Sequence, residues 1–167
     1  AIHTLEKPVI AALPGAAAGA GFSLALACDL RIAAPRATFA LPETGVGIVP
    51  GWSGTQRLAR QLPPAILKEM ALSGARITAE RAYQIGFLNG VEDDPRAAAQ
   101  QIADRIAEAG PQATETTKWL ISAAIEEDAA ACIEALAGAA MAPTAEKAEG
   151  VEAFSEKRRP DFGKSLR

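Results

Sequence analysis

The first third of the chain alternates short apolar runs with loops of small residues, a pattern typical of an α/β fold. The apolar runs Val9–Leu13 and Leu30–Ala34 suit buried strands, and Thr38–Leu41 is a third candidate strand. Between the first two runs, the sequence predicts a loop over Pro14–Gly21 and a buried helix over Phe22–Cys28. The region is therefore expected to be mixed α/β.

The later part of the chain has the spacing and the end signals of helices. Thr78 and Asp94-Pro95 are expected to begin two of them, and Gly86 and Gly110 to end them. Three more predicted helices follow: Pro111–Ile125, Asp128–Met141 and Thr144–Lys157. We therefore predict two regions, a mixed α/β part over residues 1–62 and an all-helical part over residues 63–167.

Composition excludes several classes of protein. With 167 residues, 22% of them charged and 49% hydrophobic, the chain fits a globular protein rather than a disordered or fibrous one. A formal net charge of −3 argues against a nucleic-acid partner. The two cysteines, Cys28 and Cys132, form no disulfide framework or metal-site spacing, and the one histidine, His3, disfavours a His-centred triad. These counts favour a reduced, cytoplasmic protein that uses no metal.

One apolar stretch is long enough to cross a membrane. Val9–Cys28 contains no charged residue. However, Pro14, Gly15, Gly19 and Gly21 interrupt it, and its many alanines lower its hydrophobicity. We therefore expect a strand, a loop and a helix here, and no membrane partner.

Two loops are candidates for chemistry. Gly15–Gly21 (GAAAGAG) lets a backbone approach a ligand closely, although helix–strand packing and a dinucleotide-binding loop are alternative interpretations. Glu43 lies among apolar residues and glycines, a setting in which a carboxyl group can take part in proton transfer. The alternative for Glu43 is an ordinary surface glutamate.

Four blocks of sequence resemble the crotonase (enoyl-CoA hydratase/isomerase) family and keep its order and spacing. They are KPVIAALPGAAAGAGFSLALACDLRIA (Lys7–Ala33), FALPETGVGIVPGWSGTQRL (Phe39–Leu58), SGARITAERAYQIGFLN (Ser73–Asn89) and EGVEAFSEKRRPDF (Glu149–Phe162). The resemblance covers essentially the whole chain, and the chain resembles the C-terminal two-thirds of a family member. It implies a β-β-α spiral core, whose C-terminal part would be residues 1–62, followed by a helical oligomerisation region over residues 63–167.

The resemblance also implies an activity. Family members bind a coenzyme A thioester as substrate, need no cofactor, and hold the thioester oxygen with two backbone N–H groups while an enolate forms. The motif match assigns one donor to Ala20, with Gly19 and Gly21 beside it as substrate-binding residues. The other donor belongs to an upstream block that this sequence lacks. The expected partner is an acyl-CoA in fatty acid metabolism, and the expected assembly is a homotrimer or a dimer of trimers.

The family's hydratases use two glutamates, and only one of them is matched here. Glu43, in LPE, matches the second glutamate, whereas Ser23 stands in the place of the first. A serine hydroxyl is no general base near neutral pH, although it can hold a water or a substrate oxygen. A single carboxylate favours isomerase-type chemistry over water addition, and both remain open. A catalytically silent family member that acts as an oligomeric scaffold is the alternative.

Three further residues are candidate substrate-binding residues. Trp52 would line the acyl pocket, or pack in the core instead. Phe154 and Lys157 fall where family members approach the nucleotide end of the coenzyme. For Lys157, a solvated surface position is the alternative.

Overall fold

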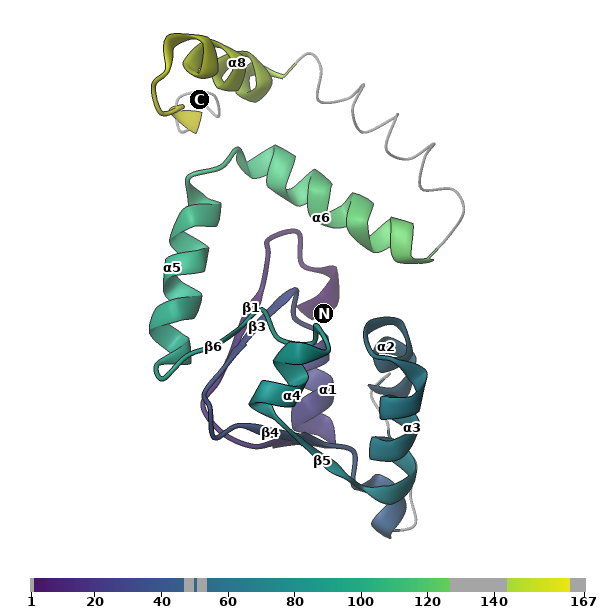
Figure 1. Cartoon of the computed structure of the whole chain (residues 1–167). Coiled ribbons are helices and arrows are strands. Elements are labelled where there is room, and N and C mark those ends of the chain that lie inside the picture. The colour runs from purple at the N-terminus through teal and green to yellow at the C-terminus, as the bar shows by residue number, and fades with distance from the viewer. Residues whose placement is uncertain (1, 47–49, 51–53, 127–143, 163–167) are drawn as a thin grey trace. The chain divides into compact units, whose positions relative to one another are not determined.

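The computed structural model describes residues 2–46, 50, 54–126 and 144–162, with only the backbone given for 46, 54–56, 125, 126, 146 and 154 (Figure 1). The predicted helix over Asp128–Met141 lies outside these residues. The chain divides into two compact units, one formed by Ala1–Leu5 with Val9–Ala103 and the other by Glu6–Pro8 with Asp104–Arg167.

Two small sheets form the frame of the first unit. One has the order β1-β3-β6 with parallel strands; in the other, β2-β4-β5, β2 is parallel and β5 antiparallel to β4. The first four strands therefore alternate between the two sheets, which gives two ββα units, β1-β2-α1 and β3-β4-α2, as expected of a spiral core (Figure 1). The strands are β1 (Ile10–Leu13), β2 (Ala17–Ala18), β3 (Leu30–Ala33), β4 (Thr38–Ala40), β5 (Arg76–Thr78) and β6 (Gly90–Val91).

The helices of this unit begin and end largely where local signals predict. The backbone N–H of Arg81 donates to Thr78 Oγ1 at 3.2 Å, and that of Ala97 donates to Asp94 Oδ1 at 3.0 Å, so both predicted caps are confirmed. Gly86 has a φ of 78° just after the first of these helices. The helices are η1 (Ile2–Thr4), α1 (Ala20–Leu26), η2 (Glu43–Val46), α2 (Gly54–Gln61), α3 (Pro64–Ser73), α4 (Ala79–Gln84) and α5 (Pro95–Ala107), the last of which continues into the second unit.

Two sequence predictions need correction. The region after residue 63 is not all-helical, because β5 and β6 add one strand to each sheet. Pro14–Gly21 is not only a loop, since it contains β2 and α1 already begins at Ala20. These strands have two or three residues each, too few to show a periodic pattern, and pairing with distant segments forms them.

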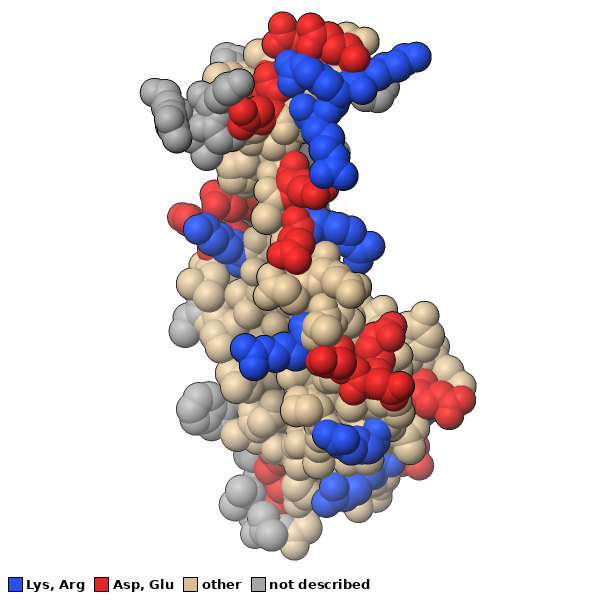
Figure 2. Space-filling view, turned by 90° about the vertical axis from the view of Figure 1, so that its left-hand side faces the viewer, with Lys and Arg blue, Asp and Glu red and all other residues tan. Residues whose placement is uncertain are grey.

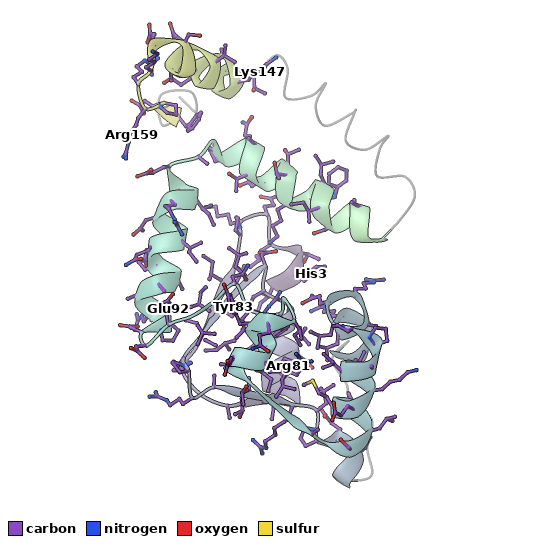
Figure 3. All side chains as sticks on the ribbon, viewed as in Figure 1. His3, Arg81, Tyr83, Glu92, Lys147 and Arg159 are labelled. Atoms are coloured by element: carbon purple, nitrogen blue, oxygen red, sulfur yellow. The ribbon has the colours of Figure 1, made fainter. Side chains whose placement is uncertain are left out.

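The second unit is mainly helical from Asp104 onward in the residues described. Its main elements are α6 (Pro111–Glu126) and α8 (Ala145–Glu156). Arg158, just after α8, forms ion pairs with Glu149, Glu152 and Glu156, and its hydrogen bonds to Glu149 and then Glu156 raise its pKa. Basic and acidic side chains are interspersed in this way over the face of the protein shown in Figure 2. Arg159, labelled in Figure 3, pairs with Glu108 at 3.2 Å.

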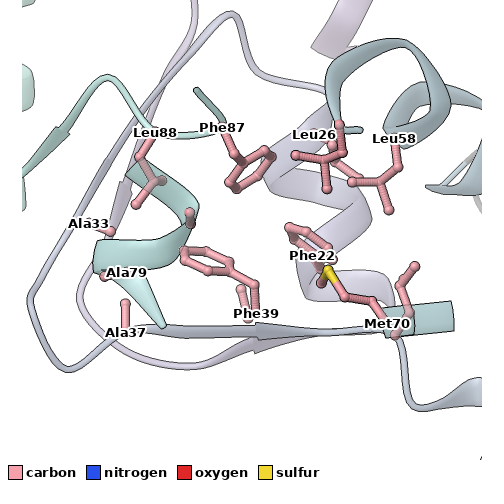
Figure 4. Packing of buried hydrophobic residues seen from close by; sticks show 14 residues of the cluster. Phe22, Leu26, Ala33, Ala37, Phe39, Leu58, Met70, Ala79, Phe87 and Leu88 are labelled. Atoms are coloured by element: carbon pink, nitrogen blue, oxygen red, sulfur yellow. The ribbon is translucent and has the colours of Figure 1, made fainter. Parts of the chain in front are cut away.

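Three phenylalanine rings form the centre of the first unit's core. Phe22 of α1, Phe39 of β4 and Phe87 have ring centroids 5.2–5.5 Å apart, and all three are buried (Figure 4). Leu58 of α2 and Met70 of α3 belong to the same cluster. Because Phe22 and Phe39 lie on α1 and β4, this core fixes the two elements that lead to Gly19 and Glu43.

Candidate functional site

Gly19 turns the chain from β2 into α1. Its N–H donates to Ala40 O at 3.1 Å, and its carbonyl accepts from the N–H of Ser23 at 2.9 Å. Its φ of 53° and ψ of −122° place it in a region that residues with a Cβ rarely adopt. Gly19 is the N-cap of α1, and it supplies no side-chain hydrogen bond to the first N–H groups of the helix.

Glu43 lies directly beside this turn. It is the first residue of η2, which follows β4 through Leu41 and Pro42. Its Oε1 lies 3.1 Å, and its Cδ 3.7 Å, from the position that a Cβ on Gly19 would occupy. Its Oε2 is buried without a hydrogen-bond partner among the described residues. The fold therefore brings together three predicted residues, Gly19, Ala20 and Glu43.

Ser23 and Gly21 lie on the same helix end. The Ser23 side chain is only 4% exposed, one turn after Gly19. Gly21 is exposed, and a Cβ placed on it would have nothing within 4 Å. The start of α1 thus has a buried hydroxyl on one side and open space on another.

The other predicted substrate-binding residues lie elsewhere in the chain. Trp52 falls outside the described residues. Phe154 and Lys157 belong to the second unit, Phe154 within α8 and Lys157 exposed just after it. Lys157 has a φ of 54°, the only positive value among the described residues other than glycine. The structure leaves the substrate roles of these three residues as predictions.

A buried arginine holds the opposite end of α1. Arg31 of β3 donates from Nε to Phe87 O at 2.8 Å and from one terminal nitrogen to Cys28 O at 2.9 Å. Its guanidinium carbon also lies 4.7 Å from the centre of the Phe87 ring. Burial lowers the pKa of Arg31, with Cys28 and Asp29 opposing that shift. The sequence did not single out Arg31, because one of these two acceptors, Phe87 O, lies 56 residues further along the chain.

Asp29 holds the segment after α1 against the start of β1. Its Oδ2 accepts a 2.7 Å hydrogen bond from the N–H of Val9, at the start of β1. Its role in this contact is to tie two backbone segments together.

A threonine beside Glu43 was also missed. Thr44 Oγ1 donates to Ala71 O of α3 at 2.9 Å. The only sequence signal for this bond is a hydroxyl next to the candidate acid. The carbonyl that accepts it lies 27 residues further along the chain. This bond joins the segment that carries Glu43 to a helix of the first unit.

The arrangement has the parts needed for proton transfer next to a carbonyl group. Glu43 presents a carboxylate oxygen without a hydrogen-bond partner among the described residues, and the neighbouring turn presents the N–H of Ala20. Among the described residues, no group of three or more His, Cys, Asp or Glu side chains is placed to hold a metal ion. Within those same ranges, no helix combines the length and hydrophobicity needed to cross a membrane.

The sequence matches known proteins along nearly its whole length. The model of the enoyl-CoA hydratase/isomerase family matches residues 1–165. The chain is 40% identical over 165 residues to the crotonyl-CoA hydratase of Syntrophomonas wolfei, covering 96% of this chain and 64% of that protein. It is 39% identical over 165 residues to the 2,3-dehydroadipyl-CoA hydratase of Escherichia coli, covering 96% and 65%.

Solved structures show the same fold. The enoyl-CoA hydratase of Bacillus anthracis superposes with a TM-score of 0.93 at 39% identity, covering 96% of this chain and 64% of that one. The enoyl-CoA hydratase of Polaromonas sp. JS666 gives 0.91 at 38% identity, with the same two coverages. The chain spans only 54–65% of the length of four curated relatives that it matches.

Proposed function

Because the chain belongs to the enoyl-CoA hydratase/isomerase family, we propose that the whole protein acts on an acyl-CoA thioester, with Glu43 as its acid/base. Glu43 would remove a proton from the bound acyl group and return it. The N–H of Ala20 would hold the thioester oxygen as negative charge develops on it. Each such donor typically contributes about 2.7–4 kcal/mol to lowering the barrier.

The observation that carries this proposal is the contact between Glu43 and Gly19. Glu43 Oε1 lies against Gly19, whereas its Oε2 is buried and has no partner among the described residues. A buried carboxylate oxygen without a partner is costly, and a role in chemistry is one reason for a protein to retain it. Ala20 follows Gly19 directly in the sequence. The base, Glu43, and the proposed oxyanion donor, the N–H of Ala20, would therefore meet the same substrate.

Ser23 favours a proton shift over the addition of water. Adding water requires a group that activates the water as well as one that exchanges a proton with carbon, and hydroxyl groups are poor bases. One carboxylate suffices when the same group removes and returns a proton. Several relatives are named as hydratases, so hydration remains the second form of this proposal.

The substitution at Ser23 also favours a different class of function. A family member without the first carboxylate would serve as a silent oligomeric scaffold if its remaining site bound no thioester. Calorimetry of the full-length protein with a short saturated acyl-CoA separates the two. Saturable binding supports the enzyme, and its absence supports the scaffold.

Glu43→Gln in the full-length protein tests the proposal directly. This change keeps the size of the side chain and removes its basic oxygen, so turnover of a short enoyl-CoA should fall by about 100-fold or more. Acyl-CoA binding should persist. Glu80→Gln, which changes an exposed glutamate of α4, is the matched control and should leave turnover unchanged. Near-normal turnover of Glu43→Gln would falsify the assignment.

A further inference from the structure

The hydroxyl of Thr44 occupies an acceptor that α3 leaves free. Thr44 Oγ1 donates to Ala71 O at 2.9 Å, in the last turn of the helix. In a longer helix this carbonyl would accept from the N–H of Ala75. Here α3 ends at Ser73 and is capped by Gly74, which has a φ of 70°. The N–H of Ala75 donates to Ser73 Oγ at 3.2 Å instead. The Ala71 carbonyl is therefore available to a donor from another element.

The segment on both sides of Glu43 rests on this helix end. Thr44 follows Glu43 and makes the hydrogen bond to Ala71. Pro42 precedes Glu43, and its Cα lies 3.8 Å from the position of a Cβ on Gly74. The backbone of Glu43 is thus held between two neighbours that both contact the end of α3.

Such support is needed because the segment has little stability of its own. η2 has only four residues, and helices of this kind are too short to persist without tertiary contacts. Glu43 Oε2 does not anchor the segment, since it has no hydrogen-bond partner among the described residues. The position of the carboxylate therefore depends on where the backbone of η2 is held.

We propose that Thr44 is a positioning residue for Glu43. Its hydrogen bond to Ala71 holds η2 on α3 and so fixes how far Glu43 Oε1 stands from Gly19. This inference rests on the proposed function, in which Glu43 carries the proton. Small displacements of a catalytic group reduce the rate of the chemical step more than they reduce substrate binding.

Three variants of the full-length protein test this role. Thr44→Val keeps the shape of the side chain and removes its donor, so kcat for a short enoyl-CoA should fall about tenfold. KM should change by less than about twofold, because no contact to substrate is lost. Thr44→Ser restores the hydroxyl and should recover most of the rate. Ser122→Ala removes a helix hydroxyl bond away from η2, the one from Ser122 Oγ to Lys118 O at 3.0 Å, and should leave kcat unchanged.

A double variant links the effect to Glu43. Once Glu43→Gln has removed the base, adding Thr44→Val should cost no further turnover. The inference is overturned if Thr44→Val keeps wild-type kcat, if Thr44→Ser loses as much as Thr44→Val, or if KM rises in step with the lost activity. If Glu43→Gln is inactive but Thr44→Val keeps wild-type kcat, only the role of Thr44 is overturned. A fully active Glu43→Gln overturns both proposals.

Discussion

Glu43 Oε1 lies 3.1 Å from the point where a side chain on Gly19 would begin. The two residues are 24 positions apart in the sequence, and they meet because β2 and β4 pair, with Ala18 opposite Ala40. β2 ends at Ala18, just before Gly19, and β4 ends at Ala40, three residues before Glu43. The pairing of these two strand ends therefore brings the carboxylate close to the turn. Gly19 thus has two reasons to lack a side chain, its positive φ and its contact with Glu43.

Gly19→Ala should therefore damage both stability and activity. Such a sparsely populated backbone conformation costs a residue with a Cβ about 1–3 kcal/mol, and the new methyl group would push Glu43 Oε1 away. We expect a lower melting temperature and a loss of turnover of at least about tenfold. Gly15→Ala, in the loop before β2, is the control, because its Cβ would have nothing within 4 Å. Equal effects of the two changes on turnover would show that the contact with Glu43 does not matter.

The sequence predicted what depends on neighbouring residues. Thr78 and Asp94 were identified as caps because each bonds an N–H three residues away. The strands β2 and β5 were missed because their partner, β4, is remote in the sequence. The same limit hid the bond from Thr44 to Ala71. Spacing alone left Glu43 ambiguous, and the family resemblance was needed to relate it to Ala20.

Ser23 offers a test of which reaction the site favours. Ser23→Glu would restore a pair of carboxylates, and should raise hydration of a short enoyl-CoA relative to any double-bond shift. Because position 23 is only 4% exposed, the new charge should also lower the free energy of unfolding. Ser23→Gln is the matched control, since it adds the same bulk without a base. If wild-type protein already hydrates such substrates faster than it shifts their double bonds, the argument from a single carboxylate is wrong.

Lys157 combines a strained backbone with a predicted binding role, and two substitutions separate them. The N–H of Arg158 donates to Ala153 O at 3.0 Å, a bond that closes the end of α8 and holds Lys157 at a φ of 54°. Lys157→Gly should relieve about 1 kcal/mol of strain and raise the melting temperature by about 3 °C, whereas Lys157→Ala should not.

Binding of a short saturated acyl-CoA then tests the ammonium group itself. If Lys157 contacts the phosphates of the coenzyme, both substitutions should weaken binding several-fold in calorimetry, and the loss should shrink at high salt. Unchanged affinity in both variants would identify Lys157 as a surface residue whose only special feature is its backbone.

The described part of the second unit exposes several large apolar side chains. Trp119 and Ile121 on α6 are 55% and 58% exposed, and Val151 on α8 is 57% exposed. Large apolar side chains exposed in this number commonly mark contacts between subunits, and closed symmetry is the usual outcome. The family resemblance predicts three protomers or a multiple of three.

Light scattering of the full-length protein should therefore give a mass near a multiple of three protomers. Trp119→Glu should shift that mass toward the monomer, because a charge would have to be buried in the contact. Thr117→Glu places the same charge at an exposed position two residues earlier on α6 and is the control. A monomer at micromolar concentration in the unmodified protein would contradict the prediction. It would also remove any binding site that needs Lys157 of a neighbouring subunit.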